Sequence, residues 1–233
     1  EYELRVLYDQ GQLEQVIAQA AIHIKRDPDA FVIWNFLGAA YKGLGKIEEA
    51  AEAFKKVTQL SPSHADGYGN LGIALRQQGK LEQAINAQRK ALSLKPDFAE
   101  AYNNMGVILV EQGKLEEAIE AFKKAVTLKP DYAGAHAQMI HQKQHICDWS
   151  NRAQDLASAA RLGIKTAAVP PFSMLSLEDN PERHLLRSQK YAAETFKHHP
   201  PSLPAPPIKK PAKLRIGRSE EHTSELQSPC NLV

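Results

Sequence analysis

ADGYGNLGIALRQQGKLEQAINAQRKALSLKPDF, residues 65–98, is followed directly by AEAYNNMGVILVEQGKLEEAIEAFKKAVTLKPDY, residues 99–132. The second stretch repeats the landmarks of the first, each displaced by 34 residues. A fixed period of this length is typical of a solenoid built from helical repeats, in which each repeat packs against its neighbours. Apolar residues between the landmarks recur at helical rather than strand spacing, so the chain is predicted to be all-α.

The same landmarks occur before residue 65. Residues 31–64 form a complete copy and residues 1–30 match the end of an earlier one, so residues 31–132 are predicted to be three repeats. The copies resemble the tetratricopeptide repeat, a pair of helices, which implies a right-handed solenoid. The first copy has every landmark of that pattern: Trp34, Leu37, Gly38, Tyr41, Gly45, Ala50, Phe54 and Pro62. Later copies depart from it at Leu75, Leu109 and Gln88.

The landmarks predict local structure. Proline should end each second helix, since it lacks a backbone N–H and clashes with the preceding turn. The residue after each proline is predicted to cap the next helix by accepting free backbone N–H groups. These capping residues are Asp29, Ser63, Asp97 and Asp131. Glycine between the paired helices suits a left-handed residue, and small residues such as Gly72 and Ala84 should let the helices approach closely.

The repeat pattern fades after residue 132. Residues 133–146 are predicted to be a helix that closes the apolar end of the solenoid. Residues 147–212 are predicted to be a linker, with helices at 151–162 and 182–197 and then a stretch rich in proline.

The end of the chain has a different character. Residues 213–217, KLRIG, are predicted to be the first strand of a further domain that has been truncated. Residues 218–233 include RSEEHTSELQS, which resembles the translation of a sequencing-library adapter, and are expected to be non-native. The start at Glu1, without methionine and part-way through a repeat, also predicts a fragment.

Composition narrows the class of protein. A formal net charge of +2, with no long basic run, does not favour a nucleic-acid partner. The chain has no apolar run long enough to span a bilayer and no signal peptide, so no membrane partner is expected. Only Cys147 and Cys230 are present, which argues against a disulfide framework and fits a reducing compartment. The expected location is the cytoplasm.

Asn70 and Asn104 are the candidate partner-binding residues. They occupy the same position in the first helix of successive copies, so stacking should place one above the other. An asparagine side chain donates and accepts hydrogen bonds, and could hold an extended peptide backbone whatever its sequence. The alternative is a structural ladder bonded to neighbouring helices. In the first copy Phe36 occupies the position, with Asn35 beside it, so the ladder is predicted to be broken there.

A metal site is the weaker hypothesis. His141 and His145 are four residues apart on a predicted helix and share a face, with His136 and Cys147 nearby. No second ligand pair with metal-site spacing follows, so a face of the capping helix with a buried cysteine is favoured and no metal site is predicted. No catalytic motif was found either, and no catalytic residue is assigned.

The segment after the repeats carries a second resemblance. Residues 145–150, HICDWS, resemble the junction after the repeats in the protein O-GlcNAc transferase family, including its bacterial and SPINDLY-like members. Residues 169–191 resemble the linker that follows, and KLRIG resembles the first strand of the glycosyltransferase core. The resemblance implies a parent enzyme that uses UDP-GlcNAc or a related nucleotide sugar. Its important histidine is not assigned to His222, which lies in the adapter-like tail.

Two functions therefore remain open. In the first, the chain is the protein-binding repeat region of a protein O-glycosyltransferase and presents acceptor proteins to a catalytic domain that is missing here. This fragment itself is then predicted to be inactive and to need no cofactor. In the second, it is a non-enzymatic tetratricopeptide-repeat adaptor. Both predict protein or peptide partners in the concave groove, and the sequence downstream of Gly217 in the gene would distinguish them.

Overall fold

The computed structural model describes residues 1–174 and 179–195, and its regular secondary structure over these ranges is helical. The prediction of an all-α chain is therefore confirmed. The chain divides into two compact units between Gln142 and Lys143, within the ninth helix.

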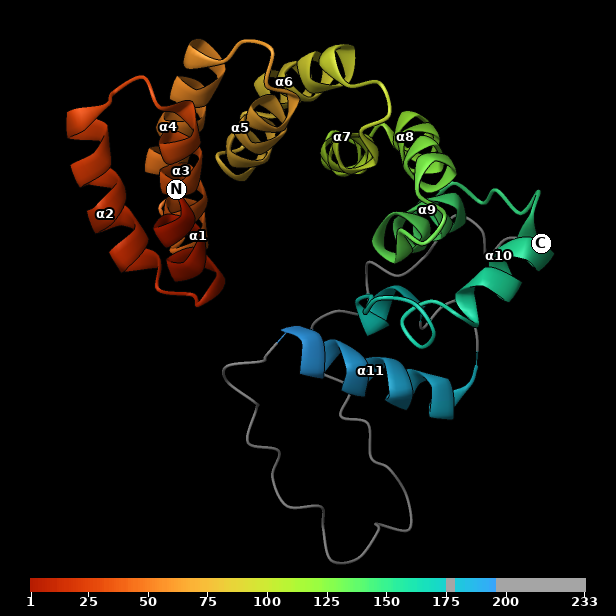
Figure 1. Ribbon diagram of the computed structural model, residues 1–233. Coiled ribbons are helices and arrows are strands. Elements are labelled where there is room, and N and C mark those ends of the chain that lie inside the picture. The colour runs from red at the N-terminus through yellow and green to blue at the C-terminus, as the bar shows by residue number, and fades with distance from the viewer. Residues whose placement is uncertain (175–178, 196–233) are drawn as a thin grey trace, which may run out of the picture. The chain divides into compact units, whose positions relative to one another are not determined.

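The first unit is a stack of helix pairs. Each first helix packs on the second helix of its own repeat, and each second helix packs on the first helix of the next repeat. In Figure 1, α5 and α7 lie on one side of the stack and α6 and α8 on the other. The helices are α1 (Tyr2–Asp9), α2 (Leu13–Arg26), α3 (Phe31–Gly43), α4 (Ile47–Leu60), α5 (Ala65–Gln77), α6 (Leu81–Leu94), α7 (Ala99–Glu111), α8 (Leu115–Leu128) and α9 (Ala133–His145).

The turns inside the pairs are left-handed at glycine, as predicted. Gly79 has φ of 74°, and its N–H donates to the Arg76 carbonyl at 2.8 Å, while the Lys80 N–H donates to the Leu75 carbonyl at 2.9 Å. These bonds satisfy carbonyl groups that the end of α5 would otherwise leave open. The turns at Gly45 and Gly113 have the same geometry.

Small residues let the paired helices approach closely, which confirms the packing prediction. A Cβ added at Gly106 would lie 2.7 Å from the Phe122 ring, and one at Gly38 would lie 2.7 Å from Phe54. Real side chains do not tolerate such distances, so only glycine fits at these crossings. Ala84, which was predicted to pack at the corresponding crossing in the middle repeat, is fully buried.

The predicted side-chain caps are wrong at three helices. The residue that precedes the first turn of α3, α5 and α7 is one position later than predicted, and none of the three makes a side-chain cap hydrogen bond. These N-cap residues are Ala30, His64 and Phe98. The polar residue one position earlier is outside the helix, too far back to serve the free N–H groups of the first turn. At Asp29 it is the backbone N–H that bonds, to Asp27 Oδ1 at 3.2 Å.

The second unit contains α10 (Arg152–Ala159), η1 (Pro171–Met174) and α11 (Pro181–Thr195). The helix predicted over residues 151–162 ends earlier, at Ala159. The fully buried Arg187 of α11 donates to the carbonyls of Ala159 at 2.6 Å and Leu162 at 2.8 Å. These carbonyls are thereby satisfied outside a helical ladder, which is the physical reason that the helix can stop there.

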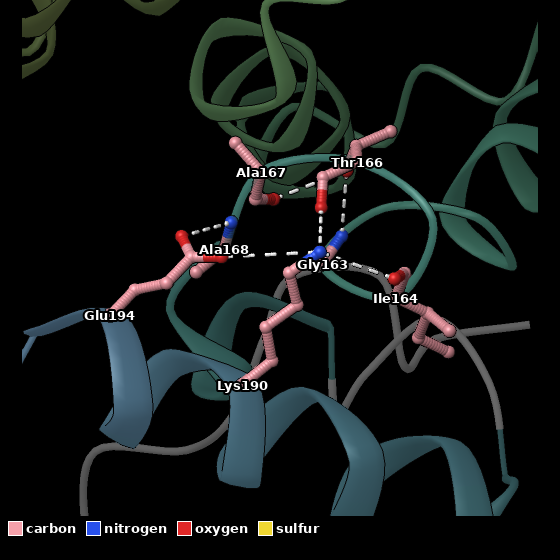
Figure 2. A network of polar contacts seen from close by, with 7 residues as sticks. All are labelled: Gly163, Ile164, Thr166, Ala167, Ala168, Lys190 and Glu194. Carbon is pink, nitrogen blue, oxygen red and sulfur yellow. Dashed lines mark hydrogen bonds and ion pairs between the residues drawn. The ribbon is translucent and has the colours of Figure 1, made fainter.

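Two more side chains of α11 hold the loop of residues 163–168, which follows Leu162 (Figure 2). Lys190 donates to the carbonyls of Ile164 and Thr166, and Glu194 accepts the Ala168 N–H at 3.0 Å. A left-handed glycine, Gly163 at φ 69°, begins the loop. The polar contacts thus fix a segment without regular secondary structure against a helix.

Several predictions fall on residues outside the described ranges. They are the proline-rich part of the linker, the strand at 213–217 and the tail at 218–233, which includes His222. None of the helices in the described part of the chain is long and apolar enough to cross a membrane.

Candidate functional site

The two predicted asparagines lie on neighbouring first helices, Asn70 on α5 and Asn104 on α7, and both are half-buried. Asn70 Nδ2 donates to Asn35 Oδ1 on α3 at 3.1 Å. The prediction that the ladder is broken in the first copy is therefore wrong. Asn35 lies one position before the expected one in its repeat, and its side chain still reaches Asn70 across the gap between helices.

The Asn35–Asn70 pair retains unused hydrogen-bonding groups. Each amide has two N–H donors and one carbonyl acceptor. The bond between them uses one N–H of Asn70 and the oxygen of Asn35, which leaves the Asn70 oxygen as an acceptor and the Asn35 amide as a donor. A peptide backbone unit presents the same two functions in complementary form. The bond between the two helices is what the structural ladder predicts, and the remaining donor and acceptor are the groups that a peptide backbone would need.

The polar series extends into α9. Gln138 lies 34 residues after Asn104, so it occupies the same position of the repeat, and it is half-buried. The repeat landmarks did not point to this residue because they fade after residue 132. The period itself was the signal that could have found it.

Charges on the first helices are partly neutralised. Arg76 on α5 forms an ion pair with Glu111 on α7, and both side chains are about one-third exposed. Lys42 on α3 is half-buried, and burial lowers the pKa of its ammonium group. One cation of the first helices is thus paired, and another is partly desolvated.

A separate hollow of about 500 Å³ lies between α6, α7 and α8. Its lining includes the apolar Met105 and Leu109 together with glutamates of α8. Leu109 stands where the first copy has the longer Tyr41. The hollow contains neither Asn70 nor Asn104, so it is distinct from the amide series.

The histidine cluster does not bring three possible metal ligands together. Among residues 1–174 and 179–195, no group of three His, Cys, Asp or Glu side chains is arranged to hold a metal ion. His136 and His141 are half-buried and His145 is exposed. Cys147 is half-buried rather than buried, and its φ of 56° ends α9, with the Asp148 N–H donating to the Lys143 carbonyl at 2.9 Å.

Comparison with known families identifies the repeats. A family model described as TPR repeat matches residues 38–79 and 74–113, and the tetratricopeptide repeat model matches residues 99–132. A comparison with curated proteins found no match.

Solved structures share the fold at low sequence identity. PilF from Pseudomonas aeruginosa is 17% identical, with a TM-score of 0.66 over 86% of this chain and 90% of that one. MamA from Desulfovibrio magneticus RS-1 is 22% identical, with a TM-score of 0.62 over 69% of this chain and 91% of that one. YrrB, described as a TPR protein with an unusual peptide-binding site, is 18% identical, with a TM-score of 0.55 over 80% and 88%.

Proposed function

The chain is a tetratricopeptide repeat protein over residues 38–132, and on that basis we propose that it is a protein-interaction module that binds an extended peptide segment of its partners. The peptide lies along the first helices α3, α5 and α7, where Asn70 and Asn104 contact its backbone. Solenoids of this kind use such a continuous face as a binding surface. The peptide-binding site named for YrrB is in keeping with this role.

The observation that carries the proposal is the bond between Asn70 and Asn35. The bond holds the amide groups of two neighbouring first helices next to each other. Both side chains are half-buried, and one donor and one acceptor of the pair remain unused. A protein surface recognises peptide groups through main-chain hydrogen bonds best when its own donors and acceptors are already fixed in place. Binding then costs less conformational entropy.

The test is a double variant, Asn70→Ala/Asn104→Ala, of the 233-residue chain. We expect it to lose binding to partner peptides while its far-ultraviolet circular dichroism stays unchanged. Asn86→Ala is the matched control, since Asn86 is an exposed asparagine on the second helix α6. Unchanged binding by the double variant would assign the asparagines to structure alone.

A finer proposal is that the module holds acceptor proteins for a glycosyltransferase. It rests on the sequence likeness of residues 145–150 and 169–191 to the junction and linker of the O-GlcNAc transferase family. The adaptor function needs no such partner and accounts equally well for the repeats. A glycosyltransferase core encoded downstream of Gly217 in the gene would favour the finer proposal, and a stop codon or another module would favour the adaptor.

The chain itself is expected to transfer no sugar. Incubation of the purified 233 residues with UDP-GlcNAc and candidate acceptor proteins should leave the acceptors unmodified. Transfer under these conditions would overturn the view that the described helices serve only to bind.

A further inference from the structure

The hollow between α6, α7 and α8 has a filled counterpart near the start of the chain. The apolar residues that line the hollow are Ile85, Leu92, Met105, Leu109 and Ala121. Two periods earlier, the equivalent residues are Ile17, Ile24, Leu37, Tyr41 and Ala53. All five of these earlier residues belong to one hydrophobic cluster across α2, α3 and α4.

The two sets differ in one aromatic ring. Four of the five positions carry aliphatic side chains of similar size in both sets, whereas Leu109 replaces Tyr41. The ring of Tyr41 packs against its cluster and is half-buried. The shorter Leu109 leaves a space of about 500 Å³ beside apolar side chains. Covering such surface with another apolar group is favourable, so an aromatic side chain from a partner would supply what this copy lacks.

Two of the three glutamates that line the hollow have no cationic partner. Glu120 forms an ion pair with Lys123 at 3.4 Å. Among the residues that the structure describes, no ion pair involves Glu116 or Glu117, and both are exposed. Both lie in the first turn of α8, so two uncompensated carboxylates stand side by side in the sequence where this helix begins.

The cations that line the hollow are placed elsewhere. Lys124 comes two turns later on α8, and its Nζ lies 5.5 Å from the centroid of the Tyr102 ring. Arg89 lines the hollow from α6. A cation on the ligand is therefore expected near the beginning of α8, where the carboxylates are unpaired.

We propose that the hollow is a second docking site, which takes an aromatic side chain of a partner protein together with a neighbouring lysine or arginine. The aromatic ring occupies the space that Leu109 leaves, and the cation meets Glu116 and Glu117. This inference goes beyond the binding of peptides along the first helices, because neither Asn70 nor Asn104 lines the hollow.

The three methionines of the chain provide the measurement. Met105 lines the hollow, whereas Met139 in α9 and Met174 in η1 are buried elsewhere. The 233-residue chain, isotope-labelled at its methionine methyl groups, should give one NMR signal for each, and Met105→Leu identifies the signal of interest. A ring that enters the hollow should shift the Met105 signal through its ring current and leave the other two in place.

The probes are acetylated and amidated pentapeptides with a central phenylalanine. Lysine precedes the ring in Lys-Ala-Phe-Ala-Gln and follows it in Gln-Ala-Phe-Ala-Lys, so both directions of the bound chain are tested. Each has a counterpart with glutamate in place of lysine, and a further peptide, Lys-Ala-Ala-Ala-Gln, lacks the ring. We expect at least one lysine peptide to bind about three- to tenfold more tightly than its glutamate counterpart. The peptide without the ring should leave the Met105 signal unchanged.

Leu109→Tyr tests the hollow itself, because it supplies the ring from within the chain. Tyr41 shows that a repeat accepts tyrosine at this position, so helicity should be kept while no peptide shifts the Met105 signal. Leu75→Tyr is the matched control and should bind normally, since Leu75 is the equivalent residue of the middle copy and does not line the hollow.

A second pair of variants tests the charges. Glu116→Gln/Glu117→Gln should remove the preference for lysine, whereas Glu48→Gln/Glu49→Gln, at the equivalent positions of the first copy, should leave the preference unchanged. These variants decide the matter if Leu109→Tyr lowers the helicity.

Several outcomes would overturn the proposal. They are a Met105 signal that no peptide shifts, equal binding of lysine and glutamate peptides, and shifts that survive Leu109→Tyr. A Met105 signal that depends on protein concentration without peptide would assign the hollow to a second copy of this chain instead. Asn70→Ala/Asn104→Ala should bind these peptides as the unmodified chain does, so this site and the proposed function can fail independently.

Discussion

Replacing Gln88 by phenylalanine should stabilise the first unit. The other two complete copies have Phe54 and Phe122 at this position, both fully buried. Gln88 is equally buried. Its Nε2 donates to the Gly69 carbonyl at 3.0 Å, but its Oε1 has no hydrogen-bond partner. The middle repeat therefore carries a half-satisfied amide where its neighbours carry an aromatic ring.

The magnitude follows from three contributions. Removing the unpaired oxygen should recover about 1–3 kcal/mol, and losing the bond to Gly69 should cost about 0.5–1.5 kcal/mol. Burying the additional apolar carbons of the ring contributes about 1 kcal/mol more. The larger ring has space because Gly72 lies opposite Gln88, as Gly38 and Gly106 lie opposite the two phenylalanines. The net gain should be about 1–2 kcal/mol after some strain of fitting.

The assay is urea unfolding of the variant and the unmodified chain, followed by circular dichroism. The urea midpoint should rise with little change in slope, since the surface exposed on unfolding is nearly the same. Phe122→Gln is the matched control and should cost about 3 kcal/mol, because it removes ring packing and buries an amide. A lower or unchanged midpoint for Gln88→Phe, beside a strongly destabilised control, would refute the argument that the three crossings are equivalent.

Three further outcomes can be measured in the same way. Ala84→Leu should lower the free energy of unfolding by about 1–3 kcal/mol, because Ala84 is fully buried at a crossing and a longer side chain overpacks it; an unchanged melting curve would contradict the packing. Gly113→Ala should cost about 1–2 kcal/mol through backbone strain alone, since φ is 74° and a Cβ there meets nothing within 4 Å; a urea midpoint equal to that of the unmodified chain would argue against the left-handed turn. Arg187→Met should speed amide hydrogen exchange in residues 159–165, because the buried guanidinium holds the carbonyls of Ala159 and Leu162; unaltered exchange would mean that other contacts hold this loop.

The period of the sequence was sufficient to predict most of the fold. Gly79 and its equivalents determine the turns, because each turn needs a residue with left-handed backbone conformation. Glycine opposite a large side chain determines the helix crossings, because only glycine leaves room for that side chain. The caps failed because a one-residue difference in where a helix begins changes which side chain can reach its N–H groups. Sequence patterns resolve such boundaries poorly.

The candidate site was predicted in part. Asn70 and Asn104 were found from the period, whereas Asn35 was set aside because it lies one position out of register. Its bond to Asn70 depends on how side chains from two helices meet in space. Gln138 follows the period and was missed only because the landmarks around it had faded.

The sequence by itself determined that the chain is a stack of helix pairs, because a repeated pattern of apolar, small and turn residues leaves each pair only its neighbours to bury its core against. Only the tertiary structure decided which polar groups of that stack remain available to a ligand. Asn35 lies one position out of register with Asn70, yet the Asn70 side chain donates to it across the gap between α5 and α3. Pairing depends on distances between helices, which no single repeat encodes.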